Sequence, residues 1–299
     1  MPLIDTIISK ISDWQGKEIT IQPLSGGLTN TNYKVTVGQK KYFLRIPGES
    51  TELLAINREN EYHNSKAAAT TGVGPGVLYH LPEYNVMVLE FLDGQTMSKG
   101  ALKTIGMPTR MAESIKRLHA GPRFMTDFNM FRLTEYYVDI CNKMNIRMPD
   151  EYVERLREVT RIEKAFLTHP VRTVPCNNDL LAENYIDDGV SLRIIDYEYS
   201  GNNDPYFELG NTSQENEFNE DQISELCQVY FGQVDEAKLS RMKLNMIMSD
   251  VGWTLWAAIQ AKISKIDYDF WGWAIQRWTR AKEKLDSDQF PKWLKEVQL

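Results

Sequence analysis

The first ninety residues of the chain alternate apolar and polar positions in the way that β-strands do. Within residues 19–48 the alternation is clear at 33–37 (YKVTV) and 42–46 (YFLRI), and glycine-containing turns separate the apolar runs. Such runs, bounded by turn residues, predict three consecutive strands. Residues 74–97 repeat the pattern on both sides of the tetrapeptide PEYN, which predicts two more strands.

A helix is expected between these two groups of strands. Residues 50–72 contain an alanine run, with Ser50 or Thr51 as the N-terminal cap and Gly72 as the stop. The amphipathic stretch 1–18 predicts a further helix that is docked on the surface. Three strands, a helix and two strands together form a compact α+β lobe.

Beyond residue 98 the hydrophobic pattern changes to that of helices. We therefore predict a small N-terminal antiparallel sheet lobe with one helix at residues 1–92, a connector near 90–94, and a larger, mainly helical C-terminal lobe at 93–299. A polar hairpin within 176–201 interrupts the helices of the second lobe. The helices are expected at 107–120, 133–145, 149–168, 219–231, 235–263 and 267–287.

Composition and charge narrow the classes of partner. The chain has 299 residues, 42% of them hydrophobic, with a net charge of −7 and a pI near 5.3. An acidic chain disfavours binding to nucleic acid or to an anionic membrane, and it favours a cationic small molecule. No apolar run approaches the roughly 18 residues of a membrane span, so we expect no membrane insertion. The three cysteines share no CxxC spacing, which disfavours disulfides and zinc and favours a cytoplasmic location.

The hairpin carries polar side chains at the mouths of its strands. Asp179 lies in the loop before the first strand, Asn184 at the start of that strand, and Asp196 at the end of the return strand 192–195. If these side chains converge, two oxygen ligands would hold Mg²⁺, and the remaining carboxylate could accept a proton from an attacking hydroxyl. An Asx turn at 177–179 and a capped bend at Asp196 would explain the same residues without chemistry, and both interpretations stay open.

The N-terminal lobe contributes a second set of candidates. Gly26 and Gly27 lie in a turn between strands, followed by small polar residues that include Asn30. Such a turn lets backbone N–H groups approach phosphates, although no Walker A sequence follows. Arg45, late on the third strand, and Glu61, on the next helix, could form the cation–carboxylate pair of a kinase. Taken singly, the turn could be only a turn, and Arg45 only an exposed strand residue.

Taken together and in this order, the motifs resemble a known family. The glycine turn, the strand cation, the helix glutamate, the connector VLEFLDG, and the stretches NNDLLAEN and IIDYEYSGNNDPYFELGN closely resemble the choline/ethanolamine kinase branch of the aminoglycoside phosphotransferase-like kinases. The resemblance covers about residues 20–285. It implies a two-lobed protein-kinase-like fold, and transfer of the γ-phosphate of ATP to a hydroxyl of a small molecule with the help of Mg²⁺.

The resemblance also implies a role for each candidate. Asp179 would be the catalytic base. Asn184 and Asp196 would be the Mg²⁺ ligands, and the nucleotide would contact Gly26, Gly27, Asn30, Arg45, Glu61, Glu90 and Leu92. The family pattern HNDxxxxN has a histidine where this chain has Asn177. That histidine is expected to brace the catalytic loop; asparagine can also donate and accept hydrogen bonds, but it is shorter and cannot be charged.

Aromatic residues gather late in the chain and indicate the class of substrate. Trp253 and Trp256 are three residues apart, hence on one helix face, and Trp273 comes from the following helix. With Tyr199 and the carboxylate of Glu215 they would suit a quaternary ammonium, which is bound by ring faces and diffuse negative charge. The alternative is that these tryptophans are core. The resemblance favours the first interpretation, because the sequence around Trp253 and Trp256 resembles the choline pocket of the family.

These observations predict a choline kinase that uses ATP and Mg²⁺ and makes phosphocholine. Ethanolamine is the nearest alternative substrate, since a primary ammonium also binds aromatic rings; thiamine or an aminosugar is more distant. A hypothesis of another class is a catalytically silent member that binds nucleotide or an amine, motivated by Asn177. The oligomeric state stays open.

Overall fold

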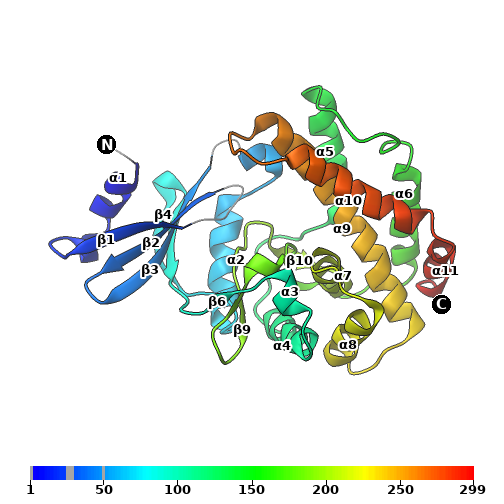
Figure 1. The fold of residues 1–299 in the computed structure, drawn as a ribbon, viewed down its shortest axis with the longest axis horizontal. Coiled ribbons are helices and arrows are strands. Elements are labelled where there is room, and N and C mark those ends of the chain that lie inside the picture. The colour runs from blue at the N-terminus through cyan, green and yellow to red at the C-terminus, as the bar shows by residue number, and fades with distance from the viewer. Residues whose placement is uncertain (1–2, 25–29, 49–50) are drawn as a thin grey trace.

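The N-terminal part of the chain is an antiparallel five-stranded sheet. The computed structural model describes residues 3–24, 30–48 and 51–299, and its sheet has the strand order β1-β2-β3-β5-β4 (Figure 1). Adjacent strands pair antiparallel throughout, as the alternating pattern predicts. The strands are β1 (Ile19–Leu24), β2 (Asn30–Val37), β3 (Lys40–Pro47), β4 (Val77–Leu81) and β5 (Val86–Glu90).

One face of this sheet is closed by the N-terminal segment. Val35, Leu44 and Val88 are fully buried, and they pack with Ile7 of the helix α1 (Leu3–Lys10) and with Trp14 in a separate small core. Burial of this apolar face stabilises the sheet independently of the larger lobe. The predicted docking of the N-terminal helix is therefore confirmed.

Helix α2 (Arg58–Thr70) joins the sheet to the second lobe, and Figure 1 shows it between them. Its cap is Asn57, whose side chain accepts a hydrogen bond from the backbone of Asn60. The predicted cap at Thr51 is wrong, because residues 51–54 form a short 3₁₀ turn; Ser50 lies outside the described residues. The buried face of α2 is polar, and the amides of Asn60 and Asn64 donate to the carbonyl of Ser200 in the second lobe.

The second lobe is built around one long helix, α9, which packs against α5, α7, α10 and α11 (Figure 1). The main hydrophobic core lies along these helices. Among the described residues the helices of this lobe are α3 (Lys99–Leu102), α4 (Met107–His119), α5 (Met130–Lys143), α6 (Leu156–Thr168), α7 (Pro205–Glu215), α8 (Glu220–Phe231), α9 (Glu236–Ile263), α10 (Phe270–Leu285) and α11 (Gln289–Glu296).

Two differences from the prediction have a clear cause. The helix predicted at 149–168 begins only at Leu156, since residues 150–155 form turns in which Glu151 has a left-handed conformation. Helix α7 was not predicted. It is buried over nearly its whole length, so its sequence lacks the apolar stripe that marks a helix with one face in solvent.

The polar hairpin predicted near the centre of the chain is present. β8 (Tyr185–Asp187) and β9 (Leu192–Ile194) pair antiparallel, and β6 (Gln95–Thr96), which follows the connector, adds a third strand. On either side of the hairpin, β7 (Val174–Cys176) pairs with β10 (Gly201–Asn203). The loops between these short strands carry the candidate residues. Among the described residues, no helix is long and apolar enough to cross a membrane.

Candidate active site

The loop after β7 presents Asp179, and its backbone is held from behind. The N–H groups of Asn177 and Asn178 donate to the two carboxylate oxygens of Glu208 on α7, at 2.8 and 2.7 Å. Asn178 has a positive φ of 71°, a conformation that costs energy outside glycine and must be held by its surroundings. Its side chain supplies part of that support, because it donates to the carbonyl of Tyr199.

Asn177 braces the loop at the position where the family pattern has histidine. Its side-chain nitrogen donates to the carbonyls of Asp196 (2.7 Å) and Ile195 (3.2 Å). Its side-chain oxygen accepts from the backbone N–H of Asp179 at 3.1 Å. The fully buried asparagine thus ties the loop of Asp179 to the segment of Asp196, which is the bracing that the sequence comparison expected of the histidine.

The side chain of Asp179 is left free by this arrangement. Among the described residues, no group donates a hydrogen bond to its carboxylate, whereas its backbone carbonyl accepts from Asn184 at 2.7 Å. Burial raises the pKa of Asp179, as do the nearby carboxylates of Glu215 and Asp196, and the charge of Arg277 opposes this rise. In its ionised form, a half-buried carboxylate without a hydrogen-bond donor among the described residues is suited to accept a proton from a bound hydroxyl.

Asn184 and Asp196 come together at the same end of the hairpin. The backbone carbonyl of Asn184 accepts from the N–H of Ile195 at 3.0 Å, which places Asn184 beside the residue that precedes Asp196. The amide nitrogen of Asn184 is engaged with Asp179, so its side-chain oxygen remains as a ligand. Asp196 has a φ of 64° and a side chain that is 31% exposed. These contacts place Asp179, Asn184 and Asp196 on neighbouring segments, and their roles as base and metal ligands stay a prediction.

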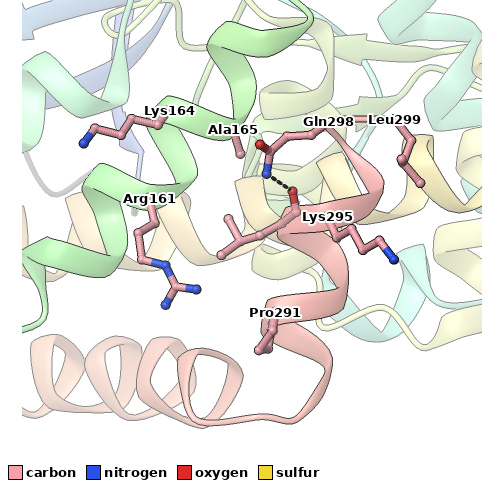
Figure 2. Close-up of a pocket in the computed structure, with 8 residues that line it drawn as sticks. Arg161, Lys164, Ala165, Pro291, Lys295, Gln298 and Leu299 are labelled. Carbon is pink, nitrogen blue, oxygen red and sulfur yellow. Dashed lines mark hydrogen bonds between the residues drawn. The ribbon is translucent and has the colours of Figure 1, made fainter.

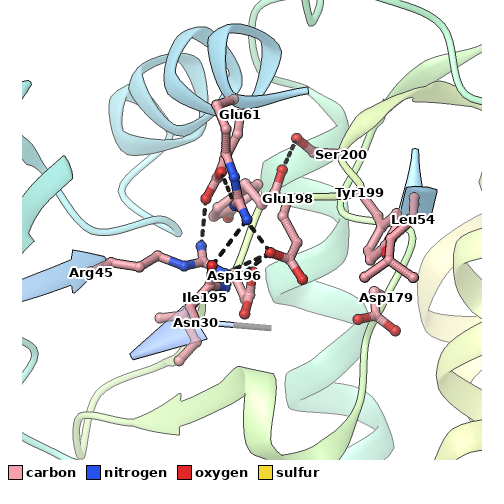
Figure 3. Close-up of polar contacts among 12 residues, drawn as sticks. Asn30, Arg45, Leu54, Glu61, Asp179, Ile195, Asp196, Glu198, Tyr199 and Ser200 are labelled. Atoms are coloured by element: carbon pink, nitrogen blue, oxygen red, sulfur yellow. Dashed lines mark hydrogen bonds and ion pairs between the residues drawn. The ribbon is translucent and has the colours of Figure 1, made fainter. Parts of the chain in front are cut away.

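A network of charges lies between the sheet and the second lobe (Figure 3). Arg45 donates to Glu61 at 2.5 Å, to Asp196 at 2.7 Å and to Glu198 at 3.1 Å. Burial opposes the charge of Arg45, but the three carboxylates outweigh it and raise its pKa. The predicted pairing of Arg45 with Glu61 is confirmed, and the alternative that Arg45 is an exposed strand residue is wrong, since only 7% of its side chain is exposed.

The other residues predicted to contact the nucleotide lie in different environments. The amide of Asn30 donates to Glu198 at 3.0 Å, so this residue belongs to the same network. The backbone N–H of Glu90 is already bonded to the carbonyl of Gly76. Leu92, just beyond β5, is half-buried, and its backbone is not hydrogen-bonded to any described residue, so it could bind a ligand. The predicted sites at Gly26 and Gly27 lie outside the described residues.

The predicted aromatic residues of the substrate site are in contact. Trp256 donates from its indole nitrogen to the hydroxyl of Tyr199 at 2.6 Å, and the ring of Trp253 meets Tyr199 edge-on at 4.8 Å. Trp273 lies edge-on to Trp256 at 5.6 Å. Trp253 and Trp256 are nearly fully buried and also belong to the main core. The indole nitrogen of Trp253 is buried and has no partner among the described residues.

Glu215 is buried beside these rings, but it does not present a free carboxylate. Arg277 of α10 donates to both of its oxygens, the longer bond being 2.8 Å. The same guanidinium lies 4.3 Å above the ring of Trp273. Burial opposes the charge of Glu215, yet Arg277 outweighs it and lowers the pKa of the carboxyl. Contrary to the expectation from sequence, the negative charge at this position is therefore balanced within the protein.

Several residues of the site were missed at the sequence level: Arg58, Glu198, Glu208 and Arg277. Each is a charged residue, a type that is mostly solvent-exposed. Glu198 had a sequence signal, because it lies two residues after Asp196 in IDYEYS. Glu208 and Arg277 bind partners that are distant in the sequence, and Arg58 binds Glu61 on its own helix as well as the distant Asn30 and Glu198.

A buried cluster behind the loop has the composition of a metal site. Ligand atoms of His119, Cys176 and Glu208 lie within 4.8 Å of one another. Each residue is already engaged, because Glu208 accepts from the loop amides, His119 bonds the hydroxyl of Tyr230 at 2.7 Å, and the thiol lies 3.4 Å from the imidazole. Burial raises the pKa of Cys176, so the thiol stays protonated. We interpret the cluster as support for the loop.

An open hollow of about 430 Å³ lies elsewhere, between α6 and α11 (Figure 2). It is lined by Arg161 and Lys164 on one side and by Pro291, Leu294 and Lys295 on the other. None of the residues predicted for the active site lines it.

Known proteins resemble this chain in sequence and in fold. The family described as choline/ethanolamine kinase matches residues 21–237. A solved choline/ethanolamine kinase family protein from Mesorhizobium loti is 34% identical, with a TM-score of 0.87 and coverage of 99% of this chain and 98% of that chain. Choline kinase LicA from Streptococcus pneumoniae is 25% identical, with a TM-score of 0.79 and coverage of 95% and 98%. Human ethanolamine kinase 2 is 26% identical over 93% of this chain and 80% of that protein. The predicted α+β, two-lobed protein-kinase-like fold is confirmed.

Proposed function

The chain belongs to the choline/ethanolamine kinase family, and we propose that it transfers the γ-phosphoryl group of ATP to the hydroxyl of choline. The observation that carries this proposal is the position of Asp179. Its carboxylate has no hydrogen-bond donor within the described part of the chain. It lies near Tyr199, on the opposite side of Asp196 and Glu198 from Arg45 (Figure 3). A hydroxyl between the aromatic residues and the nucleotide would meet this carboxylate first.

In the proposed reaction, Asp179 orients the choline hydroxyl and accepts its proton while the oxygen attacks the γ-phosphorus. The bond between the γ-phosphorus and the bridging oxygen breaks, and ADP leaves. Arg45 supplies positive charge at the phosphates, with Glu61 holding its guanidinium from the other side. Leu92 offers a backbone N–H and carbonyl to adenine. The sheet lobe, residues 1–92, would then carry the nucleotide and residues 93–299 the chemistry.

The donor set fits Mg²⁺. Asn184 retains a side-chain oxygen, and the Asp196 carboxylate is partly exposed with one oxygen that Arg45 does not occupy. A hard cation of this kind uses few protein oxygens and completes its shell with phosphates and water. When bound, Mg²⁺ would neutralise charge on the phosphates of ATP. Asn177 would keep the ligand Asp196 and the base Asp179 in place, because it is hydrogen-bonded to the backbone of both.

The residues of the predicted amine-binding site support choline over ethanolamine as the substrate. A primary ammonium brings three N–H donors that need acceptors once water is removed, whereas a trimethylammonium group brings none. The only carboxylate predicted for this position, Glu215, already has both oxygens bonded to Arg277. Ring faces of Tyr199, Trp253 and Trp256 can bind a diffuse cation without hydrogen bonds.

The test is a comparison of kcat/KM for choline and for ethanolamine, with ATP and Mg²⁺ saturating and ADP release as the readout. We expect choline to be preferred, and Asp179→Asn to abolish turnover without loss of folding. A clear preference for ethanolamine would overturn the argument from the aromatic residues. Absence of transfer to either amine by the wild-type protein would support the catalytically silent alternative.

A further inference from the structure

A second arginine, Arg58, lies in the charge network of the cleft. It is the first residue of α2, and 11% of its side chain is exposed. One nitrogen donates to Glu61 at 2.7 Å and to Glu198 at 3.2 Å, and the other donates to Asn30 at 3.0 Å. These three partners come from α2, from the second lobe and from the start of β2. Arg58 therefore connects both lobes and the start of β2.

The two arginines share two carboxylates. Glu61 gives one oxygen to Arg45 and the other to Arg58, and one oxygen of Glu198 accepts from both. Asp196 differs, because only Arg45 of the two contacts it. Glu61 and Glu198 are also deeply buried, with side chains 1% and 7% exposed, whereas the side chain of Asp196 is 31% exposed.

The sharing of Glu61 and Glu198 between two arginines affects how the network can respond to a bound nucleotide. If Asp196 turns toward a metal ion and Arg45 toward phosphate, the bond between them is lost and the hold of Arg45 on the two glutamates weakens. A buried carboxylate that loses a cation is destabilised. The bonds of Arg58 to both glutamates do not involve Arg45, so they can persist when Arg45 moves.

We propose that Arg58 is a positioning residue for nucleotide binding: it holds Glu61 and Glu198 in place, so that Arg45 and Asp196 can separate and engage the nucleotide. The inference rests on the proposed function for the roles of Arg45 and Asp196. The planar fork of arginine is needed, because two nitrogens reach three acceptors on three segments. A lysine could keep one or two of these bonds but could not span all of them.

The experiment compares Arg58→Gln and Arg58→Lys with the wild type. The control is Arg123→Gln, which removes an exposed arginine paired with Asp127 outside the cleft. The Kd for ADP is measured by calorimetry without any amine, and KM is measured for ATP and for choline. We expect Arg58→Gln to raise the Kd for ADP and the KM for ATP about tenfold or more, the equivalent of one charged hydrogen bond. Arg58→Lys should fall between Arg58→Gln and the wild type.

The KM for choline should stay within about twofold of the wild type, since the loss of Arg58 does not change the aromatic residues that are proposed to bind the amine. Equal increases for both substrates, or an unchanged Kd for ADP, would overturn the proposal. If Arg58→Gln does not fold, Arg58→Lys decides: an ADP affinity equal to that of the wild type would overturn it. Because ADP binding needs no amine, this arm still tests Arg58 if the protein fails to phosphorylate choline.

Discussion

Glu208 offers the sharpest test of how the catalytic loop is held. It is fully buried on α7, and its two oxygens accept the backbone N–H groups of Asn177 and Asn178 at 2.8 and 2.7 Å. Glu208→Ala removes both acceptors and leaves two buried donors without partners. Glu208→Gln keeps one acceptor oxygen but turns an NH₂ group toward the other N–H.

The magnitudes follow from these contacts. A hydrogen bond to a charged group contributes about 1.5–3 kcal/mol, and an unsatisfied buried donor costs about 1–3 kcal/mol. Loss of both bonds in Glu208→Ala should therefore lower the free energy of unfolding by about 3–6 kcal/mol, and Glu208→Gln by about half of that. Activity should fall further than stability alone explains, because Asn178 has a positive φ and the loop that presents Asp179 relaxes without its support.

Urea denaturation and steady-state kinetics of the same preparations would check this. The control is Glu236→Gln, which removes an exposed carboxylate paired with Lys292 and should change neither quantity. At temperatures where each variant is fully folded, we expect kcat to fall while the KM for ATP changes little. If Glu208→Ala unfolds, Glu208→Gln carries the test. A Glu208→Gln protein with wild-type stability and wild-type kcat would refute the reasoning.

Three further predictions concern the amine site, the loop and the helix packing. Trp256→Leu should raise the KM for choline about threefold or more relative to the KM for ATP, because a cation–π contact contributes about 0.5–2 kcal/mol. Equal increases in the two KM values would mean that this tryptophan serves only the core. Asn177→Ala should lower kcat about tenfold or more, because it removes the hydrogen bonds to the backbone of Ile195, Asp196 and Asp179. Asn177→His should keep most of the activity, since an imidazole can also donate and accept, and a larger loss for histidine than for alanine would contradict this role. Gly210→Ala should lower the midpoint of thermal unfolding, since a Cβ there would lie 2.7 Å from the carbonyl oxygen of Met242 and overpacking costs about 1–3 kcal/mol. The control is Gly100→Ala, where a Cβ meets open space, and equal midpoints for the two variants would show that the packing of α7 on α9 tolerates the extra methyl group.

The elements that the sequence predicted well are those with one face in solvent. The strands of the N-terminal sheet and the helices α4 and α10 show clear periodicity, because their buried residues recur with the period of a strand or a helix. Helix α7 escaped prediction because its surroundings are buried on every side. The start of α2 was misplaced because several polar residues near it could serve as a cap, and Thr51 is excluded only by the turn at 51–54.

For the site, the sequence by itself determined which groups are available: the spacing of Asp179, Asn184 and Asp196 around a hairpin, and the tryptophans on one helix face. Short-range geometry carries this information, because strand and helix periods relate residues that are close in the chain. The tertiary structure decided how the charges pair. Arg45 meets Asp196 across 151 residues, and Arg277 meets Glu215 across 62. In a sequence, a buried charged residue looks like a solvated one, since its partner comes from a distant segment and only the fold brings the two together.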